Sequence, residues 1–250
     1  MDFAPAVSFS DVAGGALVLV GLVVLAVSAR YVWRASVVVR APAVAALDDA
    51  AEGAVVRLTG TVEEPVNDAV VAPFSGRECV ALRVEIEERR LSVLYVLPWY
   101  VTVYEATAAV PFTLAAGRAS VRVAEPTRTV QADTTIVARA GPGESPSDDI
   151  SAFERDADGV SASSWWRSPP RVLRPVFRAV SIGTRRYTEQ RIAPGDEATV
   201  VGRVRDGTLD SLVLSDRGPR ATVVRMARTA VGGVCVGLAG LAVGGFLLLG

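Results

Sequence analysis

Two long apolar segments without charge lie near the two ends of the chain, and a polar region of short alternating stretches separates them. The first segment covers residues 12–29. Extended to Trp33, it holds about 22 residues, which at roughly 1.5 Å per residue is enough to cross the hydrocarbon core of a bilayer. The second covers residues 229–250. The pattern therefore predicts transmembrane helices at 12–33 and 229–250, with a short tail at 1–11.

Each apolar segment has an alternative interpretation. The first resembles a signal peptide, with Val27-Ser28-Ala29 as its cleavage site, but residues 1–11 lack the basic residues that such a peptide needs. The second resembles the buried helix of a soluble domain, but it is longer than a normal core helix. We therefore expect both segments to be retained membrane anchors.

Arginine residues next to the apolar segments predict their orientation. Arginine is retained on the cytoplasmic side of a membrane, so we expect a multi-pass protein of the cell membrane with a cytoplasmic middle domain and both termini outside. These arginines are Arg30, Arg34 and Arg40 after the first segment, and Arg217, Arg220, Arg225 and Arg228 before the second.

The middle region shows the two-residue alternation of half-buried strands. Residues 55–64 and 79–88 alternate between apolar and polar side chains, so each predicts a strand with one buried face. Residues 93–104 are rich in β-branched and aromatic side chains with a central proline. At that length they predict a hairpin with Pro98-Trp99-Tyr100 at its tip rather than a third span.

Two more hairpins follow from turn residues. One is predicted in residues 109–125, with its turn near Gly117. The other is predicted in residues 197–215, where Asp206-Gly207 is a strong turn signal. Many short strands with close turns predict a mainly β fold, a small β-barrel or sandwich.

We expect this β domain to consist of two parts with an insertion between them. The parts are residues 50–140 and 185–220. Residues 141–184 are rich in Gly, Pro, Ser and Asp, which predicts a partly irregular insertion with a short helix near 148–157.

Composition narrows the chemistry that is open to the chain. The net charge is −1, so no overall positive field attracts nucleic acid, and we expect no nucleic-acid partner. There are two cysteines and no histidine, too few ligands for a structural zinc site. All 26 basic residues are arginine, a bias that selection in an extreme halophile with a GC-rich genome would produce. We expect no metal and no cofactor.

Three segments resemble the GIDE, or beside-a-membrane, domain. They are PFSGRECVALRVEIEE at 73–88, VPF at 110–112 and RRYTEQRIAPGDEATVVGRV at 185–204, and the resemblance covers roughly residues 50–205. In mulan-type mitochondrial ubiquitin ligases and prokaryotic relatives this domain lies between two membrane spans. The resemblance implies a membrane-anchored domain related to RING-type ubiquitin transferases. The ligases carry a RING domain after the second span, and this sequence contains none.

The residues of this motif also have structural interpretations. Gly76 and Gly195 suit turns, Tyr187 suits a half-buried strand, and Glu87 and Glu88 suit a solvated strand end. The carboxylates of Glu85, Glu87 and Glu88 offer a cation site or an acid–base pair, but the adjacent Arg83, Arg89 and Arg90 favour a salt-bridged surface strand. Cys79 lacks a histidine to activate it, so we expect a buried core thiol rather than a nucleophile.

An arginine-rich segment in the insertion is the first candidate interaction site. Arg167, Arg171, Arg174 and Arg178 are spaced by four, three and four residues, which on a helix gives one basic stripe beside Trp165 and Trp166. This pattern is typical of a helix at a membrane interface. Pro175 inside that helix argues instead for an irregular loop packed on the barrel. We expect the aromatic side chains Trp99, Tyr100, Trp165 and Trp166 to contact the bilayer more than the charges do.

Glycines in the second apolar segment are the other candidate interaction site. Gly233 and Gly237 are four residues apart, as are Gly240 and Gly244, and small residues at this spacing allow helix backbones to approach closely. The partner helix can belong to a second copy of the chain, which would make a homo-oligomer. The alternative is that glycine is simply common in apolar segments of this composition.

The sequence therefore favours a membrane-anchored β module that binds or scaffolds an unidentified protein partner at the bilayer, without catalysis of its own. The alternative is a RING-related protein that acts with a separate catalytic partner. A transport or channel role is disfavoured because neither apolar segment contains a charged residue.

Overall fold

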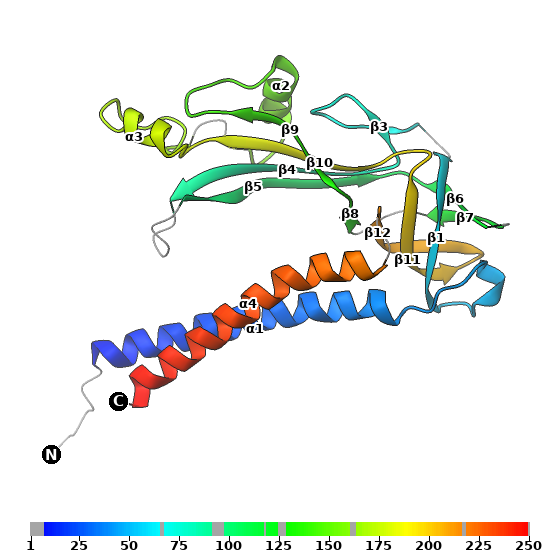
Figure 1. Ribbon diagram of the computed structural model, residues 1–250, viewed down its shortest axis with the longest axis horizontal. Helices are drawn as coiled ribbons and strands as arrows, with labels where there is room; N and C mark the ends of the chain where they lie inside the picture. Colours follow the sequence, from blue (N-terminus) through cyan, green and yellow to red (C-terminus); the bar gives the residue numbers. More distant parts are fainter. Residues whose placement is uncertain are drawn as a thin grey trace. The chain divides into compact units, whose positions relative to one another are not determined.

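The computed structural model describes residues 8–65, 68–91, 98–117, 119–124, 129–160, 164–216 and 219–249, with the backbone alone described at 31–39 and 219–231. The chain divides into two units. One consists of Met1–Ala41 and Gly218–Gly250, and the other of Pro42–Arg217. Figure 1 shows the first as a pair of long helices and the second as a set of β-sheets.

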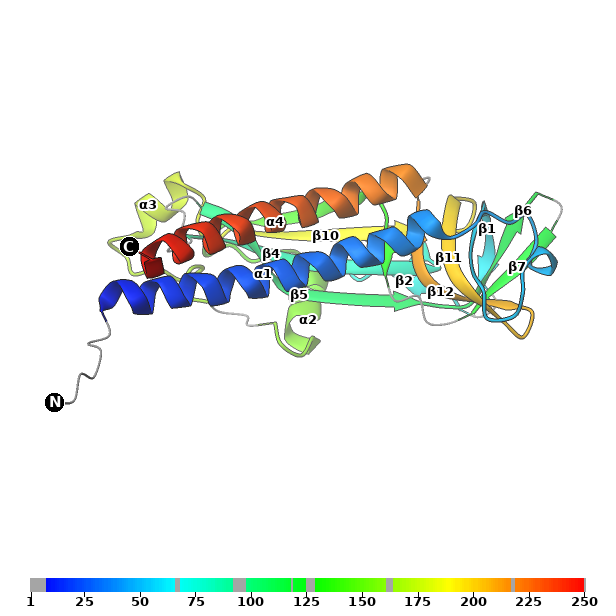
Figure 2. The ribbon, with the colours of Figure 1, turned by 90° about the horizontal axis from the view of Figure 1, so that it is seen from below.

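The first unit contains helices α1 (Phe9–Arg40) and α4 (Pro219–Leu249). Within them, Phe9–Arg30 and Gly232–Leu249 have mean hydropathies of 2.5 and 2.1. Both are long and apolar enough to cross a membrane, as the sequence pattern predicted. Two views show the helices side by side along their length (Figures 1 and 2).

The second unit contains a small closed barrel. Its described strands are paired in the order β11-β1-β6-β7-β12, and β12 pairs again with β11, so the sheet closes on itself. The β7–β12 pair is parallel and the others are antiparallel. This arrangement belongs to the class of small Greek-key barrels that includes the OB-fold. The strands are β1 (Val55–Pro65), β6 (Phe112–Ala116), β7 (Ala119–Ala124), β11 (Glu197–Arg205) and β12 (Thr208–Ser215), with β8 (Val130–Gln131) added beside β12.

Apolar side chains from alternating positions of the strands fill the barrel interior. Val56, Leu58 and Val62 of β1 point inward and pack with Phe112 and Leu114 of β6. Burial of each such side chain stabilises the fold by about 1.5–3 kcal/mol. The turn between β11 and β12 is the predicted Asp206-Gly207, with φ of 48° and 69°. Positive φ at both positions is what a two-residue hairpin turn requires.

A four-stranded sheet extends from the barrel in the order β5-β4-β10-β9. Its strands are β4 (Ala81–Leu91), β5 (Pro98–Ala109), β9 (Thr134–Ala140) and β10 (Arg185–Ile192), and a two-stranded ribbon of β2 (Val70–Val71) and β3 (Glu78–Cys79) lies nearby. Residues 141–184 connect β9 to β10 and contain α2 (Asp148–Asp156) and α3 (Arg174–Ala179); one further turn, η1 (Leu47–Asp49), precedes β1. The mainly β fold with a partly irregular insertion is confirmed.

The predicted hairpin tip at Pro98-Trp99-Tyr100 is wrong. Pro98 is the first residue of β5 and pairs with Leu91, while Trp99 and Tyr100 pair with Arg90 and Arg89 of β4. Proline lacks an N–H and is accepted at the first position of a strand. The two paired strands here are therefore β4 and β5, and β5 begins where the hairpin tip was expected. Residues 93–97 of the predicted hairpin lie outside the described residues.

Candidate functional site

The two main motifs of the GIDE resemblance contact each other through Glu189. Its carboxylate accepts hydrogen bonds from the backbone N–H groups of Phe74 and Ser75, at 2.8 and 3.1 Å. The Ser75 hydroxyl donates to the same carboxylate at 2.6 Å. Glu189 is fully buried, so the strand motif Tyr187-x-Glu189 fixes the turn that begins at Pro73. We call this contact the Glu189 clasp.

Tyr187 lies beside the clasp and is fully buried, which corrects the expectation of a half-buried strand position. Its ring meets Phe74 edge to face at 5.5 Å, and Phe74 meets Phe153 of α2 at 5.2 Å. The Tyr187 hydroxyl donates to Glu154 at 2.8 Å. Burial, together with this acceptor, raises the pKa of Tyr187 to about 12.

Glu88 is also fully buried, so its interpretation as part of a solvated strand end is wrong. It continues the inward face of β4 after Leu82, Val84 and Ile86. Arg185 lies directly opposite on β10 and donates from Nε to Glu88 at 3.0 Å. Burial by itself raises the pKa of Glu88, but hydrogen bonds from Ser164, Arg90 and Arg185 outweigh it and hold that pKa below its ordinary value.

The same arginine reaches the insertion. Arg185 Nη1 donates to Glu154 of α2 at 2.7 Å, and Arg167 lies 3.7 Å from the same carboxylate. Ser164 donates to Glu88 at 2.8 Å. We call Glu88, Arg185, Glu154 and Arg167 the buried ion cluster. It joins the insertion to the sheet at two points, and the single-strand patterns of the sequence give no sign of it.

Arg167 does not belong to the predicted basic stripe. It is only 8% exposed, and its Nη2 donates to the Glu144 carbonyl at 2.5 Å. The helix after it, α3, is short, and Pro175 lies in its first turn, where a proline disturbs no helical hydrogen bond. The segment is thus mostly irregular, as one alternative proposed, but it lies at the end of the four-stranded sheet and not on the barrel, which corrects that part of the expectation. Arg171, Arg174 and Arg178 remain exposed on it.

The four aromatic candidates differ in how much surface they offer. Trp99 and Trp165 are about half exposed, at 53% and 54%. Trp166 stacks on Phe177 at 6.2 Å and is partly covered. Arg186 lies 4.0 Å from the centre of the Tyr100 ring, a cation–π contact that occupies one face of the ring.

Both exposed tryptophans lie at one end of the four-stranded sheet. Gly183, just after α3, donates to the Arg89 carbonyl at 2.7 Å, and the neighbouring Arg90 pairs with Trp99. Figure 1 shows α3 at the end of the sheet where β4 stops and β5 begins, with the barrel at the opposite end. The fold thereby brings the start of β5, which carries Trp99, to the same end of the sheet as the arginine-rich segment, which carries Trp165.

The remaining carboxylates of β4 lie on its outer face among arginines, as the sequence favoured. Arg83 lies 2.7 Å from Glu85 and 3.2 Å from Glu105, and Arg186 pairs with Glu87. Partial burial raises the pKa of Glu85. Among the residues that the structure describes, no group of three or more His, Cys, Asp or Glu side chains is placed to hold a metal ion.

Cys79 is a buried thiol, as predicted. It donates to the Val70 carbonyl at 3.3 Å. Burial raises its pKa to about 11, so the reactive thiolate is scarce at neutral pH. Cys235 of α4 is exposed and unpaired.

The glycines of α4 lie against α1 of the same chain. A Cβ placed on Gly244 would be 2.7 Å from the Gly14 carbonyl oxygen, and one on Gly237 would be 2.7 Å from the Leu25 side chain. Real Cβ atoms are not found this close, so only glycine permits the contact. Gly233 faces Ser28, and Gly240 faces Leu17 and Gly21. Within one chain, the helix that these glycines contact is α1.

A comparison with known protein families, with curated proteins and with solved structures finds no match for this chain.

Proposed function

We propose that the chain is a membrane-anchored, GIDE-like β module that binds or scaffolds partners at the cytoplasmic face of a membrane, without catalysis of its own. The observation that carries the proposal is the order of the structural elements along the chain: helix, β unit, helix. A mainly β unit is bounded on both sides, with no intervening domain, by helices that are long and apolar enough to cross a membrane.

The chemistry of the β unit supports a binding role over a catalytic one. The carboxylates of Glu87, Glu88, Glu154 and Glu189 are used in internal ion pairs or hydrogen bonds that hold the fold together. The thiol of Cys79 is buried and its pKa is raised. The exposed part of the insertion carries both apolar and arginine side chains. The ion pair between Glu154 of the insertion and Arg185 of β10 holds the insertion to the sheet.

The topology is tested by labelling single cysteines on intact cells. Cysteines replace Ser8, Ser145 or Gly250 in a background without Cys79 and Cys235, and an impermeant maleimide is added outside. We expect labelling at the two ends and none at Ser145, which is exposed on the β unit. Labelling at Ser145 without labelling at the ends would contradict the proposed orientation.

The scaffolding role is tested by cross-linking in the membrane. A photoreactive amino acid replaces Val71 or Ile136, which are exposed on the β unit, or Val236 of α4 as a control. We expect one shared set of proteins to be captured from the β unit and a different set, or none, from α4. Identical capture from all three positions would contradict partner binding by the β unit.

The alternative function is action beside a RING-bearing protein. The observation that favours it is the Glu189 clasp, because the clasp joins two of the three segments that carry the GIDE resemblance. The same cross-linking experiment separates the two. A RING protein among the captured partners supports the alternative. We expect the purified chain alone to bind no zinc and to transfer no ubiquitin-like modifier in a reconstituted assay.

A further inference from the structure

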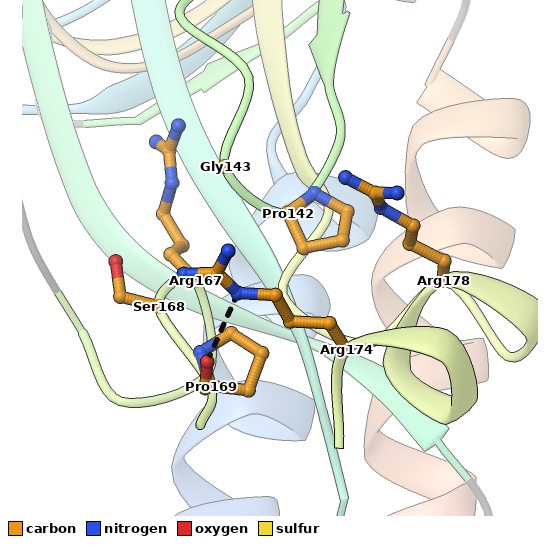
Figure 3. A pocket seen from close by; sticks show the side chains of 7 residues that line it. All are labelled: Pro142, Gly143, Arg167, Ser168, Pro169, Arg174 and Arg178. Carbon is orange, nitrogen blue, oxygen red and sulfur yellow. Dashed lines mark hydrogen bonds between the residues drawn. The ribbon is translucent and has the colours of Figure 1, made fainter. Parts of the chain in front are cut away.

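A pocket of about 180 Å³ lies between the arginine-rich segment and the loop that follows β9 (Figure 3). Arg174 and Arg178 of α3 form one wall, and Pro142 and Gly143 form the other. The Nε of Arg174 donates to the Pro169 carbonyl at 3.4 Å, which holds that guanidinium at the pocket. In Figure 3 the Arg178 guanidinium lies beside the Pro142 ring. The pocket is small, and three arginines line it: Arg167, which is paired with Glu154, and the α3 residues Arg174 and Arg178.

These two arginines differ from most others in their part of the chain. Between Asp158 and Glu189 the sequence contains no acidic residue. Arg167 is committed to Glu154 and the Glu144 carbonyl, and Arg185 and Arg186 are paired with glutamates. Within the part of the chain that the structure describes, Arg174 and Arg178 have no carboxylate within ion-pair distance. An anion is therefore the group that the pocket is equipped to receive.

Apolar side chains lie on the same short segment. Val172 and Val176 are 86% and 57% exposed, and Val180 and Trp165 are also open to solvent. Val176 lies on α3, and Val172 and Val180 lie in the turns just before and just after it. We call these three exposed side chains the apolar strip. The partly covered ring of Trp166 stacks on the buried ring of Phe177 in the same segment. A cationic pocket beside an exposed apolar strip matches a ligand that has an anionic group next to a hydrocarbon group.

We propose that Arg174 and Arg178 bind the phosphate of an anionic phospholipid headgroup while Val172, Val176 and Trp165 enter the apolar edge of the same leaflet. This assignment rests on the proposed function, because membrane anchoring at both ends of the β unit keeps it near headgroups: α1 ends at Arg40 and α4 begins at Pro219. Guanidinium groups suit phosphate because they donate two parallel hydrogen bonds to it. Free inorganic phosphate has the same chemistry but gives no role to the apolar strip.

The test uses the full chain in nanodiscs and the fluorescence of Trp165 and Trp166. Phenylalanine replaces Trp33 and Trp99, and the lipids carry bromine, which quenches nearby tryptophan, on either phosphatidylglycerol or phosphatidylcholine. We expect brominated phosphatidylglycerol to quench more strongly than brominated phosphatidylcholine at equal content. In the double variant Arg174→Gln/Arg178→Gln this preference should be lost. The matched control, Arg77→Gln/Arg122→Gln, removes the same charge from exposed positions outside the pocket and should keep the preference.

Three results would overturn the assignment. The first is equal quenching by the two lipids in the parent protein. The second is an unchanged preference for phosphatidylglycerol in the Arg174→Gln/Arg178→Gln variant. The third is loss of that preference when inorganic phosphate is added, which would assign the pocket to soluble phosphate. A variant that keeps Trp33 as its only tryptophan tests the membrane anchor separately. Quenching of Trp33 by both lipids would support the membrane anchor and so the proposed function. If Trp165 and Trp166 then showed no lipid preference, the headgroup site alone would be disproved.

Discussion

Arg185 of β10 lies directly opposite Glu88 of β4, 3.0 Å away, and both side chains are buried. Removing one partner of such a pair leaves a charge in the interior without compensation, which costs about 3–5 kcal/mol. We therefore expect Arg185→Met or Glu88→Leu alone to destabilise the β unit by this amount. The double variant should recover part of the loss. Thermal unfolding of the full chain in detergent, followed by circular dichroism, measures all three.

Acid should weaken the same cluster. The pKa of Glu88 in the folded protein is lower than its ordinary value of 4.5, so the unfolded chain binds the proton more readily. The stabilisation is fully present above pH 4.5 and is lost as the pH falls through the lowered pKa. We expect the melting temperature to fall in that range, and to fall less steeply in Glu88→Gln. An equally steep fall in the variant would assign the acid sensitivity to other groups.

The Glu189 clasp should be structural. Glu189→Ala leaves the buried N–H of Phe74 without its acceptor, and an unsatisfied buried donor costs about 1–3 kcal/mol. The matched control is Glu105→Ala, which breaks only a partly exposed ion pair and should cost less than about 1 kcal/mol. Chemical denaturation of both variants gives the comparison. If Glu189→Ala kept its stability and lost only partner capture, the clasp would be part of a binding site instead.

The packing of α4 on α1 should allow a specific disulfide. A Cβ at Gly233 lies 3.5 Å from the Ser28 Cβ, within the range that disulfides require. In a background without Cys79 and Cys235, Ser28→Cys/Gly233→Cys should oxidise within one chain. After cleavage at a protease site inserted at Ser145, the two fragments should stay joined until they are reduced.

Glycine substitutions provide the control for this cross-link. Gly244→Leu should reduce it, because the Gly14 backbone occupies the space of the new side chain, whereas Gly245→Leu should not, because nothing lies within 4 Å of that position. Cross-linked dimers in place of joined fragments would favour association between copies. Equal effects of the two leucines would contradict close packing at Gly244.

Tryptophan contacts with lipid should survive high salt. The Debye length falls to roughly 3 Å at 1 M salt, which screens exposed arginines, whereas apolar burial still contributes about 25 cal/mol per Å². For residues 41–220 on anionic liposomes, we expect Trp99→Ser/Trp165→Ser to abolish binding at molar salt. Arg174→Gln/Arg178→Gln should matter only at low salt. Trp166→Ser should add little because that ring stacks on Phe177. Loss of wild-type binding at molar salt would contradict the prediction.

Features that depend on neighbouring residues could be predicted from the sequence. The Asp206-Gly207 turn, the alternating face of β4 and the apolar helices all follow from local patterns, and the structure contains each of them. The same alternation placed Glu88 on the inward face. A charged residue at that position predicts solvation, because nothing in its sequence neighbourhood identifies Arg185, a partner that only the β4–β10 pairing brings near.

The candidate site depended on contacts between distant residues. Spacing alone grouped Arg167 with Arg174 and Arg178, but Glu154 draws Arg167 into the interior and leaves the other two at the surface. Because strands seldom contain proline, the sequence predicts a turn at Pro98, yet a strand can begin with proline, and β5 does. In both cases the deciding interaction was a tertiary one.

The barrel strand β11 has a mechanical consequence. β1, the first barrel strand after α1, pairs with one edge of β11, and β12, which leads into α4, pairs with the other. Any force that draws the two terminal helices apart is therefore applied to opposite edges of this one strand. The hydrogen bonds along both edges resist such a load together, so tension along the chain reaches the barrel before it reaches the four-stranded sheet. The insertion and its exposed surface are thereby insulated from strain that arises in the helices.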